Sequence, residues 1–114
     1  MIEIRNFSKA YDATLAVDDL TVSVKSGEIL GLIGRNGAGK TTTMRALSGI
    51  IPYGSGDFVV DGFSLHHAPL EVKRRTAYVA DDPQLFSDLT VEQHLKFQAS
   101  IYGIKKPADE ISEL

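Results

Sequence analysis

One stretch of the chain has the residue types and spacing to bind phosphate. Residues 34–42 read Gly-Arg-Asn-Gly-Ala-Gly-Lys-Thr-Thr and match the phosphate-loop pattern G-x-x-x-x-G-K-[ST] at every required position. Glycines let the backbone turn tightly, so that consecutive N–H groups point at one anion. Lys40 adds a positive charge, and the hydroxyl of Thr41 can complete a Mg²⁺ shell of phosphate and water oxygens. The stretch therefore predicts a nucleotide phosphate site.

A strand before the loop and a helix after it must hold the loop in place. Residues 28–33 are apolar at nearly every position, which is typical of a strand covered on both faces in a parallel sheet. Residues 42–48 favour a helix that opens near Lys40 and stops at Gly49. Such a helix brings its positive end and its unsatisfied N–H groups to the loop. The order of these parts predicts an α/β fold.

Two further segments, one on each side of the loop, are expected to form short strands. Residues 2–7 alternate, which puts Ile4 and Phe7 on opposite faces of a half-buried strand. The pattern then fades into an expected loop over residues 9–15. A short strand at residues 57–60, with turns on both sides, predicts a small antiparallel flap.

Further elements are expected around this flap. Residues 20–25 alternate and turn tightly at Ser26-Gly27 into residues 28–33, which predicts a hairpin between these two arms. Residues 69–75 suit a short helix, because Pro69 falls in its first turn and basic residues fall in its last turn. Residues 76–79 read as a second buried strand.

The last third of the chain begins with a helix signal. Thr90 and Gln93 have the spacing of a capping box, and the apolar side chains that follow predict a helix that Gly103 ends. Residues 104–114 are expected to be a linker and the beginning of another helix.

Composition excludes several classes of protein. The chain has 114 residues, which is one domain by length, and its 43% apolar content is ample for a core. A net charge of −3 with both signs interspersed is unlike a nucleic-acid-binding protein, so no nucleic-acid partner is expected. The absence of cysteine rules out a disulfide scaffold. The sequence shows neither a signal peptide nor an apolar run long enough to span a bilayer.

The order of these parts closely resembles the N-terminal part of an ABC-transporter ATP-binding subunit, over residues 2–103. The likeness is carried, in chain order, by Tyr11, Ala16-Val17-Asp18-Asp19-Leu20, Ser26-Gly27-Glu28-Ile29, the phosphate loop, Gly54 to Gly62, and Leu89-Thr90-Val91 with Leu95. The resemblance implies a P-loop NTPase fold of the ABC type, with a RecA-like core and an antiparallel β flap, incomplete in this chain. The implied divisions are a phosphate loop at 34–42, a Q-loop region at 80–88, the start of a helical subdomain at 90–103, and a linker with a truncated helix at 104–114.

The resemblance also assigns roles to individual residues. Tyr11 would stack on adenine and Val17 would line the adenine or ribose side. The alternative for each residue is an ordinary packed side chain. Lys40 would contact the β and γ phosphates and stabilise transition-state charge, and Thr41 would bind Mg²⁺. The residues expected to hold ATP are Tyr11, Val17, Gly34, Arg35, Asn36, Gly37, Ala38, Gly39, Lys40, Thr41 and Thr42.

The chain departs from the family pattern at the Q-loop. The family's glutamine, which reaches toward the metal and the attacking water, falls on Asp81, and Gln84 comes three residues too late. An aspartate oxygen could also meet Mg²⁺, so Asp81 is a second candidate metal ligand. The alternative is that Asp81 and its neighbours form only a solvated turn.

The family's Walker B acid, catalytic glutamate, signature motif and switch histidine would lie downstream of Leu114. His66, His67 and His94 have no partner motif and are expected to be surface or hydrogen-bonded histidines. The chain alone is therefore expected to supply binding groups without a catalytic base.

The resemblance implies partners as well as a nucleotide. A second ATP-binding domain would complete each ATP site, and a transmembrane permease would contact Leu85–Leu89, which places the protein on the cytoplasmic side of a membrane. The Gly-Lys-Thr-Thr-Thr sequence of the loop and the helix that follows Leu89-Thr90-Val91 resemble those of exporters of lipids, drugs or polysaccharides more than those of importers. Two alternatives stay open: a nucleotide-binding module without turnover, and a soluble ABC ATPase of DNA repair or translation.

Overall fold

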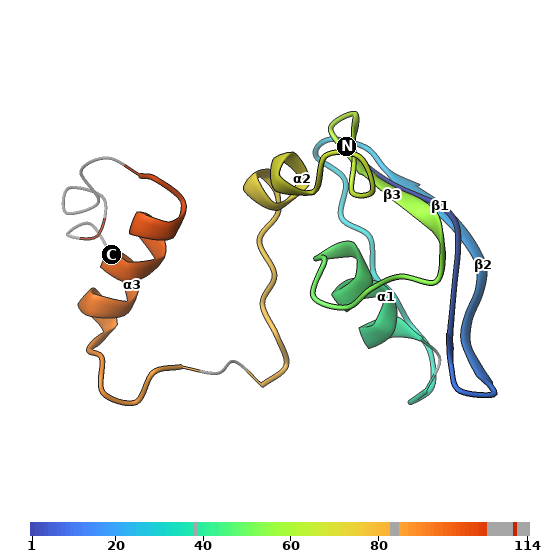
Figure 1. The fold of residues 1–114 in the computed structure, drawn as a ribbon, viewed down its shortest axis with the longest axis horizontal. Coiled ribbons are helices and arrows are strands. Elements are labelled where there is room, and N and C mark those ends of the chain that lie inside the picture. The colour runs from blue at the N-terminus through green and yellow to red at the C-terminus, as the bar shows by residue number, and fades with distance from the viewer. Residues whose placement is uncertain (38, 83–84, 105–110, 112–114) are drawn as a thin grey trace. The chain divides into compact units, whose positions relative to one another are not determined.

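Four antiparallel strands form the sheet of the first of two units, which spans Met1–Tyr78 (Figure 1). The strands are β1 (Ile2–Tyr11), β2 (Thr14–Val24), β3 (Ser55–Val60) and β4 (Phe63–Ser64), in the spatial order β2-β1-β3-β4. This computed structural model describes residues 1–37, 39–82, 85–104 and 111. The second unit spans Val79–Leu114. The predicted antiparallel flap is thus confirmed, and it is larger than expected.

The hairpin of this sheet joins β1 to β2. Tyr11 pairs with Thr14 across a two-residue turn, and Asp12 in that turn has a φ of 50°. The loop expected over residues 9–15 is therefore wrong, because both strands continue almost to the turn. The hairpin expected between residues 20–25 and 28–33 is also wrong, since β2 takes its partner from β1. Alternation shows that a segment can be a strand but leaves its partner open.

A bulge in β1 reverses the expected inward face. The register shifts between Ile4 and Phe7, and Asn6 adopts a φ of 49°. The Asn6 amide N–H donates to Thr21 Oγ1 at 2.9 Å, and the Asn6 side chain donates to Asp19 Oδ1 at 2.9 Å. Because a bulge inserts one residue, Ile4 and Phe7 both face the core, and the expectation that they lie on opposite faces is wrong.

The core lies between the sheet and the first two helices. Phe7 and Phe58 are fully buried, and their ring centroids are 4.8 Å apart. The helices contribute Ala46 and Val72, which are also fully buried. The remaining members of this cluster are Ile4, Val60 and Leu65. Burying these side chains removes apolar surface from water, which is the main force that holds the helices on the sheet.

Three helices have bounds within the described residues, and they begin and end close to their predicted limits. They are α1 (Lys40–Leu47), α2 (Pro69–Arg75) and α3 (Val91–Ile101). Gly49 follows α1 with a φ of 65°, and Gly103 follows α3 with a φ of 66°, so both predicted glycine stops are confirmed. The capping box of Thr90 and Gln93 is present in full. None of the helices that the structure describes is long and apolar enough to cross a membrane.

The two predicted buried strands are not formed. Residues 28–33 and 76–79 belong to no strand, and the exposed fractions of Ile29, Ile33 and Val79 are 100%, 99% and 87%. Apolar composition indicates where a strand is favourable, but a strand also needs neighbouring backbone for its hydrogen bonds. The described strands pair only within the order β2-β1-β3-β4, which includes neither segment.

Candidate nucleotide-binding site

The glycine-rich loop connects an extended segment to the beginning of α1. Gly37 and Gly39 have φ values of 85° and 81°, in the left-handed region that favours glycine. Gly39 is the residue that precedes α1, and no side chain caps this helix end. The loop therefore turns into the helix through backbone alone, which leaves its N–H groups available to an anion.

Gly39 is pressed against strand β2. A Cβ atom built on Gly39 would lie 2.5 Å from the carbonyl oxygen of Ala16 and 2.6 Å from Cγ2 of Val17. No other residue type fits at these distances without a shift of the β2 backbone. The pattern predicts a glycine here for its turn, and the structure adds that β2 and the loop share a contact that only glycine permits.

Lys40 folds back over the loop that precedes it. Its ammonium group donates to the carbonyl oxygens of Gly34 at 2.6 Å and Arg35 at 2.8 Å. The charge thus lies against two carbonyl oxygens of the loop. An ammonium group has three donors, so these two bonds leave one for a phosphate oxygen.

The three threonines after Lys40 have different environments. Thr43 is buried, and its Oγ1 donates to the Gly39 carbonyl at 2.9 Å, while its N–H donates to the same carbonyl at 2.8 Å. Thr41 is exposed and Thr42 is half-buried. The first turn of α1 contains no acidic residue, so its positive end is not neutralised within that turn. Thr43 therefore fastens the helix to the loop, a role that the sequence reasoning missed because it considered only the hydroxyl needed for Mg²⁺.

A pocket of about 330 Å³ lies where the loop meets β2. It is lined by Ala16, Val17, Asp18, Leu20, Leu32, Ile33, Gly39, Lys40 and Thr43. The structure thus brings Val17 together with Gly39 and Lys40, and the role of Val17 beside the adenine or ribose stays a prediction. Leu20 and Val17 supply an apolar wall, and Asp18 supplies the one carboxylate among these lining residues.

Tyr11 lies at the turn end of the same hairpin. The strand register pairs Lys9 with Val17 and Tyr11 with Thr14, so Tyr11 is near the tip and does not line the pocket. Its side chain is 48% exposed, and the Lys9 ammonium lies 5.3 Å from its ring centroid. A cation can thus rest on the tyrosine ring. The adenine-stacking role of Tyr11 stays a prediction.

The remaining predicted site residues have varied surroundings. Asp81 is exposed in a bend of the second unit, and its metal role stays a prediction. Ala38 and Gln84 lie outside the described residues. Arg35 and Asn36 are exposed in the loop. In the part of the chain that the structure describes, no group of three or more metal-ligating side chains is present.

Among the described residues, the side chains of His66 and His94 have hydrogen-bond partners. His66 Nδ1 lies 3.1 Å from the Tyr53 hydroxyl, and His94 Nε2 accepts from the Phe86 N–H at 3.1 Å. The ring of His67 packs against that of His66, with centroids 4.8 Å apart. These contacts agree with the interpretation that the histidines are ordinary packed or surface residues.

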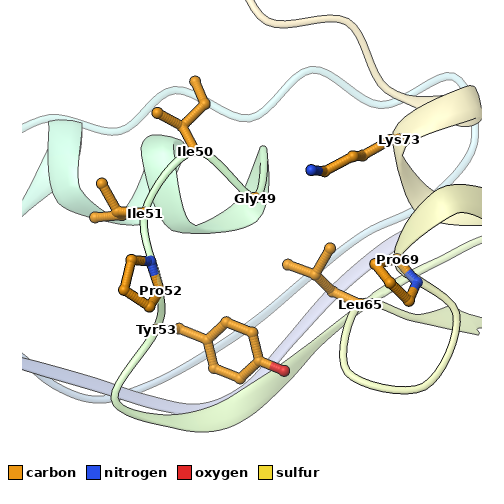
Figure 2. A pocket seen from close by; sticks show the side chains of 8 residues that line it. All are labelled: Gly49, Ile50, Ile51, Pro52, Tyr53, Leu65, Pro69 and Lys73. Carbon is orange, nitrogen blue, oxygen red and sulfur yellow. The ribbon is translucent and has the colours of Figure 1, made fainter.

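A second hollow lies at the opposite end of α1 (Figure 2). It has a volume of about 280 Å³ and is lined by Gly49, Ile50, Ile51, Pro52, Tyr53, Leu65, Pro69 and Lys73. The Lys73 side chain reaches over Gly49, where an added Cβ would lie 3.0 Å from Cε and 3.7 Å from Nζ. An ammonium at the negative end of a helix complements its dipole, which explains the position of Lys73 without a ligand.

The loop, its lysine and α1 together define the phosphate-binding loop of a P-loop NTPase. A family model described as ABC transporter matches residues 17–113. The chain therefore belongs to the ABC transporter family of ATP-binding proteins, and the resemblance and the fold class inferred from the sequence are confirmed.

Individual relatives support this assignment. The bacitracin transport ATP-binding protein BcrA of Bacillus licheniformis is 37% identical over 116 residues, which cover 100% of this chain and 38% of BcrA. The lipopolysaccharide export system ATP-binding protein LptB of Escherichia coli (strain K12) is 38% identical over 93 residues, with coverage of 80% and 39%. A solved ATP-binding subunit of an ABC transporter aligns with a TM-score of 0.83 and 35% identity, over 92% of this chain and 44% of that chain. The chain thus spans less than half of each of these relatives.

Proposed function

We propose that this chain binds the phosphates of ATP through residues 34–42, as part of a protein that couples ATP hydrolysis to transport across a membrane. The observation that carries the proposal is the joint geometry of Gly39 and Lys40. Gly39 brings the loop against β2, and Lys40 holds its charge over the loop at 2.6 and 2.8 Å from two carbonyls. This is an anion site built from backbone N–H groups, one cation and a helix N-terminus.

The ligand is assigned to ATP by the family rather than by the pocket alone. Relatives are named as ATP-binding proteins of bacitracin transport, SkfA peptide export and lipopolysaccharide export. We propose an exporter on the cytoplasmic face of a membrane, with a permease and a second ATP-binding domain as partners. Binding the γ-phosphate for in-line attack by water would then use the charge of Lys40.

The magnesium ion is proposed to use Thr41. Its hydroxyl is exposed in the first turn of α1, and a hydroxyl oxygen suits a hard cation that keeps phosphate and water as its other ligands. When bound, Mg²⁺ would neutralise phosphate charge. We retain Asp81 as a proposed further oxygen ligand.

Nucleotide binding and turnover of the full-length protein test the proposal. Lys40→Ala is expected to weaken ATP binding by tenfold or more, because a buried or paired charge contact is worth about 1.5–3 kcal/mol. Lys25→Ala, in the turn after β2, is the matched control and should leave affinity unchanged. Equal loss in both variants would contradict a specific role for Lys40. Binding without any Lys40-dependent turnover would favour the non-hydrolytic alternative.

A further inference from the structure

The ammonium group of Lys9, in β1, makes two contacts away from the phosphate loop. Its Nζ donates to the Pro52 carbonyl oxygen at 2.7 Å and lies over the Tyr11 ring, 5.3 Å from the ring centroid. Lys9 is half-buried, whereas Tyr11 is 48% exposed. One charge therefore links the end of the β1–β2 hairpin to the connection between α1 and β3, and it covers one face of the tyrosine ring.

The backbone fixes the Pro52 carbonyl beside β1. A Cβ atom built on Gly54 would lie 2.6 Å from the Ser8 carbonyl oxygen and 3.5 Å from the Lys9 Cα. Ser8 also pairs with Ser55 at the beginning of β3. The connection that carries Pro52 thus packs directly on β1, so the Lys9 ammonium is held by an acceptor of defined position.

The strand register places Lys9 between the phosphate loop and Tyr11. Lys9 pairs with Val17, and a Cβ atom built on Gly39 would lie 2.6 Å from Cγ2 of Val17. Tyr11 follows two residues closer to the turn, opposite Thr14. Lys9 therefore lies at the level of the hairpin where β2 meets the loop, and its side chain supports the ring nearer the tip.

A cation on one face of an aromatic ring favours a stacked base on the other face. The faces of the ring carry partial negative charge, so the Lys9 ammonium is attracted to the Tyr11 ring. The ammonium draws electron density toward itself, which lessens the repulsion between the opposite face and the π electrons of a purine. A ring that is held before the base arrives also loses less conformational entropy on binding.

We infer that Lys9 is a positioning residue, which holds the Tyr11 ring for stacking on the base of the nucleotide. The inference rests on the proposed ATP binding and on the predicted stacking role of Tyr11. Because Lys9 acts through the ring, its effect belongs to the base and not to the phosphates. Arginine at this position keeps a cation that can lie over the ring, whereas methionine keeps most of the stem and loses the charge.

The contact between Lys9 and Tyr11 is tested first, in the nucleotide-free full-length protein, by NMR of the lysine ε-methylene protons. Protons above the face of an aromatic ring are shifted upfield by its ring current. We expect the Lys9 signal upfield of that of Lys25, the control, and we expect Tyr11→Leu to remove the difference. An unshifted Lys9 signal overturns the inference whether or not the protein binds ATP.

The positioning role is tested by the affinities of the full-length protein for Mg·ATP and for inorganic triphosphate with Mg²⁺, measured by calorimetry. Lys9→Met should weaken ATP binding about threefold and leave triphosphate binding unchanged, which also shows that the variant is folded. Lys9→Arg should keep the parent affinity for ATP. In a Tyr11→Leu background, Lys9→Met should have no further effect.

The other outcomes separate the possible errors. Equal weakening of ATP and triphosphate binding by Lys9→Met would make Lys9 a phosphate contact and overturns the inference. An effect of Lys9→Met that persists in the Tyr11→Leu background, or no effect in the parent protein, also overturns it. A parent protein that binds neither ATP nor triphosphate overturns the proposed function itself.

Discussion

The carbonyl oxygen of Ala16 lies 2.5 Å from the position that a Cβ of Gly39 would occupy. This contact ties strand β2 to the phosphate loop, although the two residues are far apart in the sequence. Gly39→Ala is therefore expected to displace the loop and to abolish nucleotide binding. Gly27→Ala is the matched control, because Gly27 has a similar φ of 82° and nothing within 4 Å of its added Cβ.

Comparing Gly39→Ala with Gly27→Ala separates the cost of backbone strain from the cost of a steric clash with β2. Both substitutions place alanine in the left-handed region, which costs about 1–2 kcal/mol. Only Gly39→Ala also collides with β2, so its midpoint of denaturation should fall further and its nucleotide affinity should be lost. Equal effects of the two substitutions on stability and binding would show that the contact with Ala16 is unimportant.

Substitutions at Thr41 and Thr43 are expected to affect different properties: nucleotide binding for Thr41 and stability for Thr43. Thr43→Val removes the buried bond to the Gly39 carbonyl and should lower stability by about 1 kcal/mol in denaturant titrations. Thr41→Val should leave stability unchanged, because Thr41 is exposed, and should weaken Mg²⁺-dependent nucleotide binding. A stability loss for Thr41→Val, or an unchanged Thr43→Val, would reverse these assignments.

Glu71 links the stability of α2 to pH. The hydrogen bond from Arg75 lowers the pKa of the Glu71 carboxyl below its ordinary value, with a smaller contribution from the charge of Arg74. The stabilisation is present above the pKa of the unfolded chain, about 4.3, and is lost as the pH falls through the lower folded pKa. Glu71→Gln should therefore be less stable than the parent at neutral pH and equal to it in strong acid.

Stability curves of both proteins between pH 2 and pH 7 measure this effect. Glu92, whose pKa is lowered chiefly by its bond to Lys96, gives a parallel case in the second unit through Glu92→Gln. A gap between parent and Glu71→Gln that does not change with pH would contradict a role for the carboxylate charge.

The exposed apolar side chains of residues 28–33 lead us to expect self-association of the 114-residue chain. Ile29 and Ile33 are almost fully exposed and belong to no strand, and exposed apolar segments of this kind favour strand pairing between molecules. Ile29→Lys with Ile33→Lys should lower the sedimentation coefficient toward that of a monomer. Leu70→Lys, another exposed apolar position in α2, is the control. A parent chain that sediments as a monomer would refute the prediction.

The sequence alone determined the parts whose structure depends on nearby residues. The glycines of the loop, the beginning of α1 at Lys40 and the capping box of Thr90 are local, because each depends on backbone groups within a few positions. The family resemblance followed from their order and spacing. Within these limits, both the phosphate loop and the helices could be predicted.

Only the tertiary structure decided which segments meet. The bulge at Asn6 turned Phe7 inward, the pairing of β1 with β2 replaced the expected hairpin, and residues 28–33 were left without a strand partner. The contact between Gly39 and Ala16 and the buried bond of Thr43 likewise depend on chain segments that pack together. Periodicity reports which face of a segment is apolar, but pairing and register depend on contacts between distant residues, and these emerge only when the chain is folded.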